Sequence, residues 1–304
     1  MSENNKQNQS NQKCGYVAVV GRPNAGKSSF LNWIVGEKIA LVSHKANATR
    51  KRSNIIAMLE EAQTQFVFID TPGLHEREKL LNQFMLDEAL KAIGDCDLIL
   101  FLAPVTDKIC HYEDFLEKNK KNTPHIVLLT KTDFISKSEV LEKLTEYEKY
   151  SKNYKKVIPI SIKKGSYWKD ILGSLVPYMP THPYLFDEEI LTTEHLRDIF
   201  KEFIRESIFD NLSDELPYES DVMVTKIQEK PNIDVIEAKI IVDKTSQKGM
   251  IIGKGATTIK RIGQTARKKI EKLTQKKVYL ELNVVIKKGW SKDSNELKKL
   301  GYLV

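Results

Sequence analysis

Residues 16–35 read YVAVVGRPNAGKSSFLNWIV, an apolar run followed by a loop and a helix-like segment. Between a strand and a helix, a loop of the form G-x-x-x-x-G-K-S surrounds a phosphate with backbone N–H groups and the helix N-terminus. Its lysine adds a full charge, and its serine hydroxyl binds Mg²⁺. A glycine-rich turn that matches by chance is the alternative. We predict a nucleotide phosphate site made of Gly21, Arg22, Pro23, Asn24, Ala25, Gly26, Lys27 and Ser28.

The chain around this loop alternates apolar runs with helical periodicity as far as Met179. This pattern predicts an α/β fold with a doubly wound, mainly parallel sheet and one antiparallel edge. The expected strands are Tyr16–Val20, Ser53–Glu60, Gln65–Asp70, Asp97–Leu102, His125–Thr130 and Val157–Ile160. The expected helices are Lys27–Val35, Leu80–Ile93, Tyr112–Lys120, Ser138–Tyr150 and Trp168–Val176. Ligands of such sheets bind at the carboxyl ends of the strands, where the phosphate loop begins.

A second phosphate element follows the strand at 65–70 and has the form D-x-x-G. Asp70 can hold a water on Mg²⁺, and the N–H of Gly73 can contact a γ-phosphate. A strand-end turn residue is the alternative for Asp70 alone. We predict that Asp70, Thr71, Pro72 and Gly73 complete the phosphate site.

The base is indicated by Thr130-Lys131-Thr132-Asp133, which has the form [NT]-K-x-D. An aspartate at this position accepts hydrogen bonds from the ring N–H and the amino group of guanine, whereas adenine leaves the carboxylate unpaired. Lys131 would flank the base, and a backbone N–H after Ser161 would reach the guanine oxygen. The predicted guanine site comprises Thr130, Lys131, Asp133, Ser161 and Ile162, and the predicted nucleotide is GTP or GDP.

These residues resemble the translation-factor-like class of GTPases, in which the four elements are called G1, G3, G4 and G5. The resemblance implies a P-loop GTPase domain and a switch threonine that binds Mg²⁺, for which we choose Thr49. The expected Mg²⁺ residues are therefore Ser28, Thr49 and, through water, Asp70. The expected catalytic residues are Lys27, Thr49 and Gly73, which position and neutralise the transferring phosphoryl group.

The residue after Gly73 is Leu74 and not a glutamine that orients water, so we expect slow intrinsic turnover. In related GTPases with this departure, an asparagine of the phosphate loop helps to bind K⁺ in place of an arginine finger. Asn24 occupies that position, and we expect K⁺ to stimulate hydrolysis.

The net charge of +7 is unevenly distributed along the 304 residues. Residues 239–304 hold 17 basic and 5 acidic side chains, whereas residues 191–238 hold 5 and 12. A local excess of one sign is typical of a nucleic-acid surface, and a solvated lysine-rich face is the alternative. Prolines at 180 and 183 interrupt the α/β pattern. The expected parts are a disordered tail (1–13), a GTPase domain (14–179), a linker (180–191) and an RNA-binding domain (192–304).

The second domain is expected to begin with a helix containing Leu196 and Ile204, followed by strands at Ser220–Glu229 and Asn232–Val242. Two helices on either side of Gly263 and a strand at Lys277–Lys288 complete it. This order resembles an α+β KH domain of type II topology, whose G-x-x-G loop clamps single-stranded RNA. The resemblance implies RNA contacts by Ile252, Gly253, Lys254, Gly255, Ala256, Ile259 and Lys260. Ala256 replaces the last glycine, which is unfavourable if φ is positive there.

The order of a GTPase domain and one KH domain is similar to the Era family of bacterial ribosome-assembly GTPases. Residues 21–29, 48–51 and 252–255 resemble its signatures, as does the ending around Gly289-Trp290 and Gly301-Tyr302. The resemblance implies binding of the 3′ end of small-subunit (16S) ribosomal RNA, a role in 30S subunit assembly and peripheral contact with the inner membrane. An RNA-binding adaptor with a degenerate GTPase is the alternative function.

The composition limits the cellular setting. The chain has no stretch of about 18 uncharged apolar residues, and its start is polar, so we expect neither a transmembrane helix nor a signal peptide. Three cysteines without a C-x-x-C pair argue against a disulfide framework or a zinc site. We expect a cytoplasmic monomer.

Overall fold

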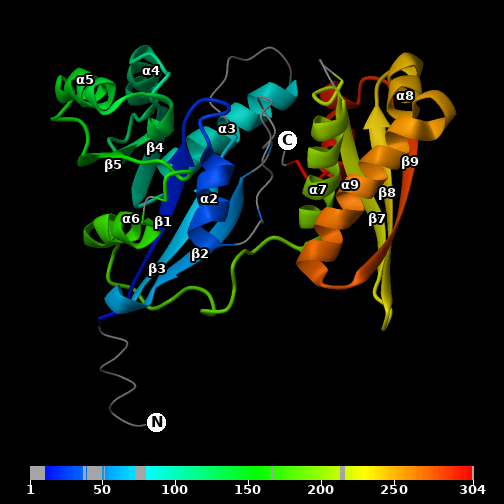
Figure 1. The fold of residues 1–304 in the computed structure, drawn as a ribbon, viewed down its shortest axis with the longest axis horizontal. Coiled ribbons are helices and arrows are strands. Elements are labelled where there is room, and N and C mark those ends of the chain that lie inside the picture. Colours follow the sequence, from blue (N-terminus) through cyan, green and yellow to red (C-terminus); the bar gives the residue numbers. More distant parts are fainter. Residues whose placement is uncertain are drawn as a thin grey trace, which may run out of the picture. The chain divides into compact units, whose positions relative to one another are not determined.

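The computed structural model describes residues 11–36, 39, 50, 52–72, 80–165, 167–212 and 216–302. The chain divides into two compact units. The first unit ends at Thr193, and the chain from Glu194 onward belongs to the second. Each unit has its own sheet and its own hydrophobic core. Figure 1 traces the chain through both. No helix in these ranges is long and apolar enough to cross a membrane.

The first unit is built on a six-stranded sheet with the order β2-β3-β1-β4-β5-β6. The strands are β1 (Lys13–Val20), β2 (Ser53–Leu59), β3 (Thr64–Asp70), β4 (Leu98–Pro104), β5 (His125–Thr130) and β6 (Lys156–Pro159). β2 runs antiparallel to β3, and the other neighbours are parallel. The predicted mainly parallel sheet with one antiparallel edge is confirmed.

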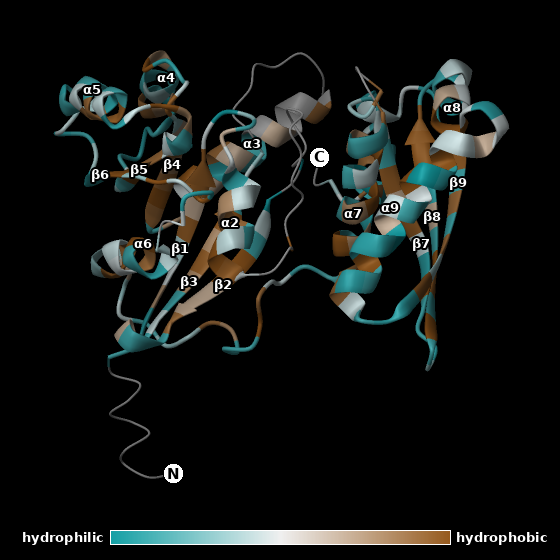
Figure 2. Ribbon diagram, in the orientation of Figure 1, coloured by the Kyte–Doolittle hydropathy of each residue, from teal (hydrophilic) through white to brown (hydrophobic). Residues whose placement is uncertain are grey.

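Helices pack on both faces of this sheet because its strands are apolar on both sides. On one face Phe101 of β4 stacks on Phe115 with ring centroids 4.7 Å apart. On the other face Phe68 of β3 meets Phe30 edge-on at 6.4 Å. The helices are α2 (Lys27–Val35), α3 (Leu80–Gly94), α4 (Cys110–Lys118), α5 (Lys137–Glu148) and α6 (Trp168–Leu175). Figure 2 shows the apolar strands between helices with more hydrophilic outer surfaces.

The strand register brings the two predicted phosphate elements to the same edge of the sheet. Val19 of β1 pairs with Asp70 of β3, and Val20 pairs with Phe101 of β4. Because these strands are parallel, their carboxyl ends lie side by side. The loop that begins at Gly21 therefore starts next to Asp70.

The buried side chain of Gln65 binds a segment more than a hundred residues away. Its Oε1 accepts hydrogen bonds from the backbone N–H groups of Leu185 and Phe186, at 2.9 and 3.1 Å, and its Nε2 donates to the Phe186 carbonyl at 2.8 Å. Further along, Ile56 of β2 donates its N–H to the Leu191 carbonyl at 2.8 Å. The segment after the predicted GTPase domain is thus attached to the first unit at several points.

The second unit contains a three-stranded sheet with the order β7-β8-β9. β7 (Ser220–Gln228) and β8 (Ile233–Val242) are antiparallel, whereas β8 and β9 (Lys277–Ile286) are parallel. The helices are α7 (Leu196–Asn211), α8 (Thr245–Ile252), α9 (Thr257–Thr274) and α10 (Ser294–Lys299). Buried residues of α7, α9 and all three strands form one core. This is the order of elements predicted for a type II KH domain.

The prediction that two helices lie on either side of Gly263 is wrong. Gly263 is inside α9, where an added Cβ would make an ordinary contact with Leu282 at 3.6 Å. The chain turns instead between Gly253 and Ala256, where three residues have positive φ. A glycine within a helical period does not by itself end a helix, whereas left-handed residues do.

A buried ionic cluster fixes the C-terminal segment to the second unit. The hydroxyl of Tyr302 donates to the Asp221 carboxylate at 2.6 Å. The same carboxylate lies 3.5 Å from Arg205 and 3.6 Å from Lys201, and Lys201 donates to the Leu300 carbonyl at 2.8 Å. Because such buried charges are stable only when paired, the C-terminal residues are an integral part of this unit.

Candidate functional site

The phosphate loop has the backbone conformation that its glycines and asparagine allow. Gly26 has φ = 99° immediately before α2, and Asn24 has φ = 61°. Asparagine tolerates the left-handed region better than most residues. A Cβ on Gly21 would lie only 2.7 Å from the Leu102 carbonyl oxygen. Gly21 is thus required by its close contact with β4, and Gly26 by its backbone angle.

Lys27 is the cation enclosed by this loop. Its side chain is largely buried, with the residue 7% exposed. The Nζ donates to the carbonyls of Gly21 and Arg22, both at 3.2 Å. Burial lowers the pKa of Lys27 to about 8, and the Asp70 carboxylate opposes that shift. A buried ammonium favours an anionic ligand, because an anion would offset its desolvation.

Ser28 and Asp70 meet at the predicted Mg²⁺ position. The Ser28 hydroxyl donates to Oδ2 of Asp70 at 2.9 Å, and both residues are buried. Hydroxyl and carboxylate oxygens are the donors that Mg²⁺ prefers, so the two residues fit this ion. Among the described residues no group of three His, Cys, Asp or Glu side chains is placed to hold a metal.

Thr71 and Pro72 follow Asp70 at the end of β3. The Thr71 hydroxyl donates to the Val19 carbonyl at 2.7 Å, which ties this segment to the end of β1. Thr49 and Gly73 lie outside the described residues. Their assigned roles, including catalysis by both and Mg²⁺ binding by Thr49, stay predictions.

The predicted guanine element contacts the phosphate loop directly. The Thr130 hydroxyl donates to the Ala25 carbonyl at 3.3 Å, and Nζ of Lys131 donates to the Asn24 carbonyl at 2.9 Å. Lys131 itself has φ = 60°, which turns the chain at the end of β5. The structure therefore brings together two motifs that are about a hundred residues apart.

Asp133 is oriented by Ser161, a role that the sequence analysis missed. The Ser161 hydroxyl donates to Oδ1 of Asp133 at 2.8 Å and accepts from the Lys164 N–H at 3.1 Å. The hydrogen bond from Ser161 lowers the pKa of Asp133. An ionised, oriented carboxylate is the acceptor that the N–H groups of guanine require. The sequence predicts only that a backbone N–H near Ser161 and Ile162 reaches the guanine oxygen.

The side chain of Arg22 forms an ion pair that the sequence did not predict. Its Nε donates to Oδ2 of Asp107 at 2.5 Å, and its Nη2 lies 2.5 Å from Oδ1. Asp107 follows β4, whose carboxyl end adjoins β1. An acidic residue just after a strand was the available signal, but the sequence could not show that Arg22 lies opposite it.

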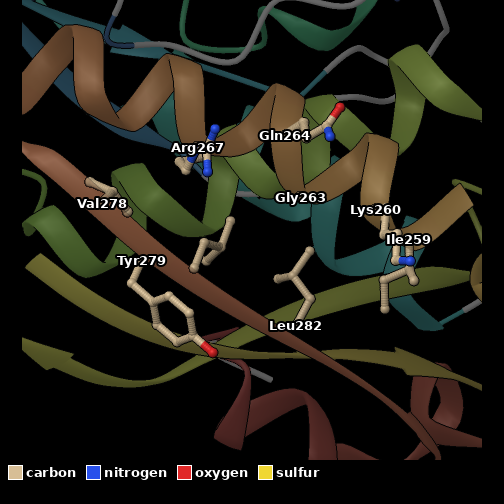
Figure 3. Close-up of a pocket in the computed structure, with 9 residues that line it drawn as sticks. Ile259, Lys260, Gly263, Gln264, Arg267, Val278, Tyr279 and Leu282 are labelled. Atoms are coloured by element: carbon tan, nitrogen blue, oxygen red, sulfur yellow. The ribbon is translucent and has the colours of Figure 1, made fainter. Parts of the chain in front are cut away.

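The second unit has a cavity of about 320 Å³ between α9 and β9. Its lining residues are Ile259, Lys260, Gly263, Gln264, Arg267, Val278, Tyr279, Leu280 and Leu282. Figure 3 shows cationic side chains from the helix and an aromatic ring from the strand around it. Of the predicted RNA contacts, Ile259 and Lys260 line this cavity. The structure adds Arg267 and Tyr279 to this lining. The basic run around Arg267 was a signal in the sequence, whereas the exposure of Tyr279 appears only in the structure.

The loop before α9 contains the other predicted RNA contacts. Gly253, Gly255 and Ala256 have φ of 72°, 58° and 60°. A Cβ on Gly253 would lie 2.3 Å from Oγ1 of Thr258, so no other residue fits without a shift. Ala256, which stands in place of the last glycine of the G-x-x-G loop, has a positive φ. An alanine in this conformation is strained by about 1 kcal/mol relative to glycine. Lys254 is exposed within the loop, and Ile252 ends α8 before it.

Comparison with known proteins agrees with both units. The family model of the 50S ribosome-binding GTPase matches residues 16–131, and that of the KH domain matches residues 215–291. The GTPase Era of Campylobacter lari is 52% identical over 290 residues, which are 95% of this chain and 99% of the relative. The GTPase Era of Helicobacter pylori strain G27 is 49% identical over 294 residues, covering 96% and 97%.

Two solved Era structures share the fold over nearly the whole chain. A variant from Aquifex aeolicus bound to GDP and AlF4⁻ has a TM-score of 0.92 and 32% identity, covering 96% of this chain and 100% of that one. An Era complex with MgGDPNP and nucleotides 1506–1542 of 16S ribosomal RNA has a TM-score of 0.91, with the same identity and coverage. With half of its residues identical to those of curated relatives along their full length, the chain belongs to the Era family of GTPases.

Proposed function

We propose that this GTPase is a switch that binds the 3′ end of 16S ribosomal RNA and acts in assembly of the 30S subunit. The proposal rests on the combination of two features in one chain. In the first unit the phosphate loop contacts the predicted guanine element, and in the second unit a cavity is lined by basic and aromatic residues. The solved Era complex with a 16S ribosomal RNA fragment supports the identity of the RNA.

In the first unit we assign the phosphate loop to the triphosphate and Asp133 to guanine. Lys27 would contact phosphate oxygens, and Ser28 and Asp70 would hold Mg²⁺, which neutralises charge on the transferring phosphoryl group. The bound MgGDPNP of the Era relative supports magnesium as the cofactor. Hydrolysis then depends on positioning and charge neutralisation and needs no covalent intermediate. The adaptor alternative is disfavoured, because the chain is a member of a GTPase family.

K⁺ is proposed as a second activating ion near Asn24. Its left-handed backbone and the contact of its carbonyl with Lys131 fix the position of Asn24 in the loop. A monovalent cation there would compensate for the missing glutamine after Gly73. Equal rates of GTP hydrolysis in KCl and NaCl would contradict this part of the proposal.

In the second unit we assign RNA binding to the loop at 253–256 and the adjoining cavity. Lys254, Lys260 and Arg267 provide positive charge for the phosphate backbone, and Tyr279, which is 56% exposed, offers a face for base stacking. Control by GTP would pass from the residues around Thr49 and Gly73 through the linker at 180–191. The proposed functional boundaries are 14–179 for the GTPase domain and 192–304 for the KH domain.

The proposed setting is the cytoplasm, with peripheral contact at the inner membrane and a monomeric state. Cross-linking to total cellular RNA and sequencing of the bound fragments would test the partner. Enrichment at the 3′ end of 16S ribosomal RNA and on 30S particles is the expected result. Fragments scattered over many RNAs would overturn the assignment of the partner.

A further inference from the structure

Arg22 of the phosphate loop forms an ion pair with Asp107, which follows β4. The Asp107 side chain is 6% exposed. Its Oδ2 accepts a hydrogen bond from Nε of Arg22 at 2.5 Å, whereas its Oδ1 lies 2.5 Å from Nη2 as an ion pair without hydrogen-bond geometry. This two-point contact, one hydrogen bond and one ion pair, restrains the guanidinium more than a single contact does. Arg22 is therefore held at one place although its side chain is 41% exposed.

Arg22 also organises the loop through its backbone. Its carbonyl accepts hydrogen bonds from Nζ of Lys27 and from the N–H of Ala25, both at 3.2 Å. The residue fixed by Asp107 is thus the one whose carbonyl helps to hold the buried ammonium. A displacement of Arg22 would be transmitted to Lys27 through a single hydrogen bond.

Asp107 is in turn supported by regular structure. Its N–H donates to the Pro104 carbonyl at the end of β4, at 2.8 Å. Its carbonyl accepts from Nζ of Lys143 on α5 at 3.3 Å, and Lys143 pairs with Glu146 at 2.7 Å. The backbone of Asp107 is therefore held by β4 and α5. Its carboxylate can in turn hold Arg22 of the phosphate loop in place.

We propose that Asp107 is a positioning residue for nucleotide binding, which holds Arg22 so that the phosphate loop is formed around Lys27 before the nucleotide arrives. The inference rests on the proposed phosphate site. Neither Asp107 nor the Arg22 side chain has to touch the nucleotide. Preorganisation lowers the ordering entropy that binding must overcome, so the effect falls on affinity more than on the chemical step.

The direct test is Asp107→Asn, which keeps the shape and removes the charge. We expect the Kd values of GDP and GTP to rise about tenfold, as for loss of a charge-assisted hydrogen bond. The single-turnover rate at saturating GTP should stay within about twofold. Glu113→Gln on α4 is the matched control, because it removes the same charge from a residue that contacts Tyr150. Its nucleotide affinity should equal that of the wild type.

A double-mutant cycle separates positioning of Arg22 from an independent effect of Asp107 on nucleotide binding. If Asp107 acts through Arg22, the combination of Asp107→Asn with Arg22→Ala should bind nucleotide no more weakly than Arg22→Ala alone. Additive losses of affinity in the double mutant would overturn the proposal. So would an Asp107→Asn variant with unchanged affinity and a lowered Tm, or one in which only the single-turnover rate falls. Arg22→Lys, which cannot make the two-point contact, provides the same test if Asp107→Asn fails to fold. Wild-type protein that binds no GTP would instead overturn the proposed phosphate site.

Discussion

The chain forms two glycine-containing loops that each precede a helix, and they expose their lysines very differently. In the loop at 21–28, Lys27 is buried and binds two backbone carbonyls. In the loop at 253–256, Lys254 is exposed. A closed loop with a buried cation suits the phosphates of a small ligand, whereas an open loop suits a polymer that passes over it.

The two loops also differ in the residues that adopt the left-handed conformation before the helix. The first loop uses Asn24 and Gly26, which adopt positive φ at little cost, whereas the second ends with Ala256 at φ = 60°. The first loop is thus relaxed, and the second retains local strain of about 1 kcal/mol.

Replacing Lys27 with Ala should lower the rate of GTP hydrolysis by about 10²–10³-fold, because one preorganised cation on the transferring group is lost. Multiple-turnover phosphate release measures the effect. Lys254→Ala is the matched control and should hydrolyse GTP at the wild-type rate. Equal losses in both variants would mean that the two loops do not act separately.

Nucleotide affinity should fall as the pH rises past the pKa of Lys27, which burial lowers to about 8. The anion binds the protonated ammonium, so the Kd of GDP should increase by up to about tenfold between pH 7 and 9. Calorimetric titration at each pH measures the change. Lys27→Arg stays charged in this range, and a pH dependence that persists in this variant would assign the effect to another group.

Replacing Lys254 with Ala should weaken binding of a 16S 3′-end oligonucleotide several-fold. One phosphate contact on a single strand contributes a slope of about −0.7 in the plot of log affinity against log salt concentration. Fluorescence anisotropy at several salt concentrations would show the reduced slope. Lys226→Ala on β7, where Lys226 pairs with Glu237, is the control, and an unchanged slope in Lys254→Ala would contradict phosphate contact.

Replacing Ala256 with Gly should raise the free energy of unfolding of the second unit by about 0.5–1 kcal/mol. Glycine relieves the positive φ, and part of that gain is offset by the greater freedom of the unfolded chain. Chemical denaturation followed by circular dichroism measures the difference. Ala266→Gly, in the helical interior of α9, should be destabilising, and a gain there would rule out the backbone explanation.

Much of the fold followed from local patterns. The apolar periods located the strands and helices because burial on one or both faces dictates which positions are apolar. The prediction at Gly263 was wrong because the residue type alone does not show whether a glycine lies inside a helix or in a turn. Only the backbone angles of Gly253, Gly255 and Ala256 show where the chain turns.

By itself, the sequence determined which residues form the two loops and predicted their chemistry, since a phosphate loop has glycines, a lysine and a following helix at fixed spacing. Only the tertiary structure decided which distant side chains meet. Asp107 meets Arg22, Ser161 orients Asp133, and Gln65 binds the segment at 185–186. These contacts depend on which strands are neighbours and on their register. Nonlocal packing sets that arrangement, so no stretch of sequence contains it.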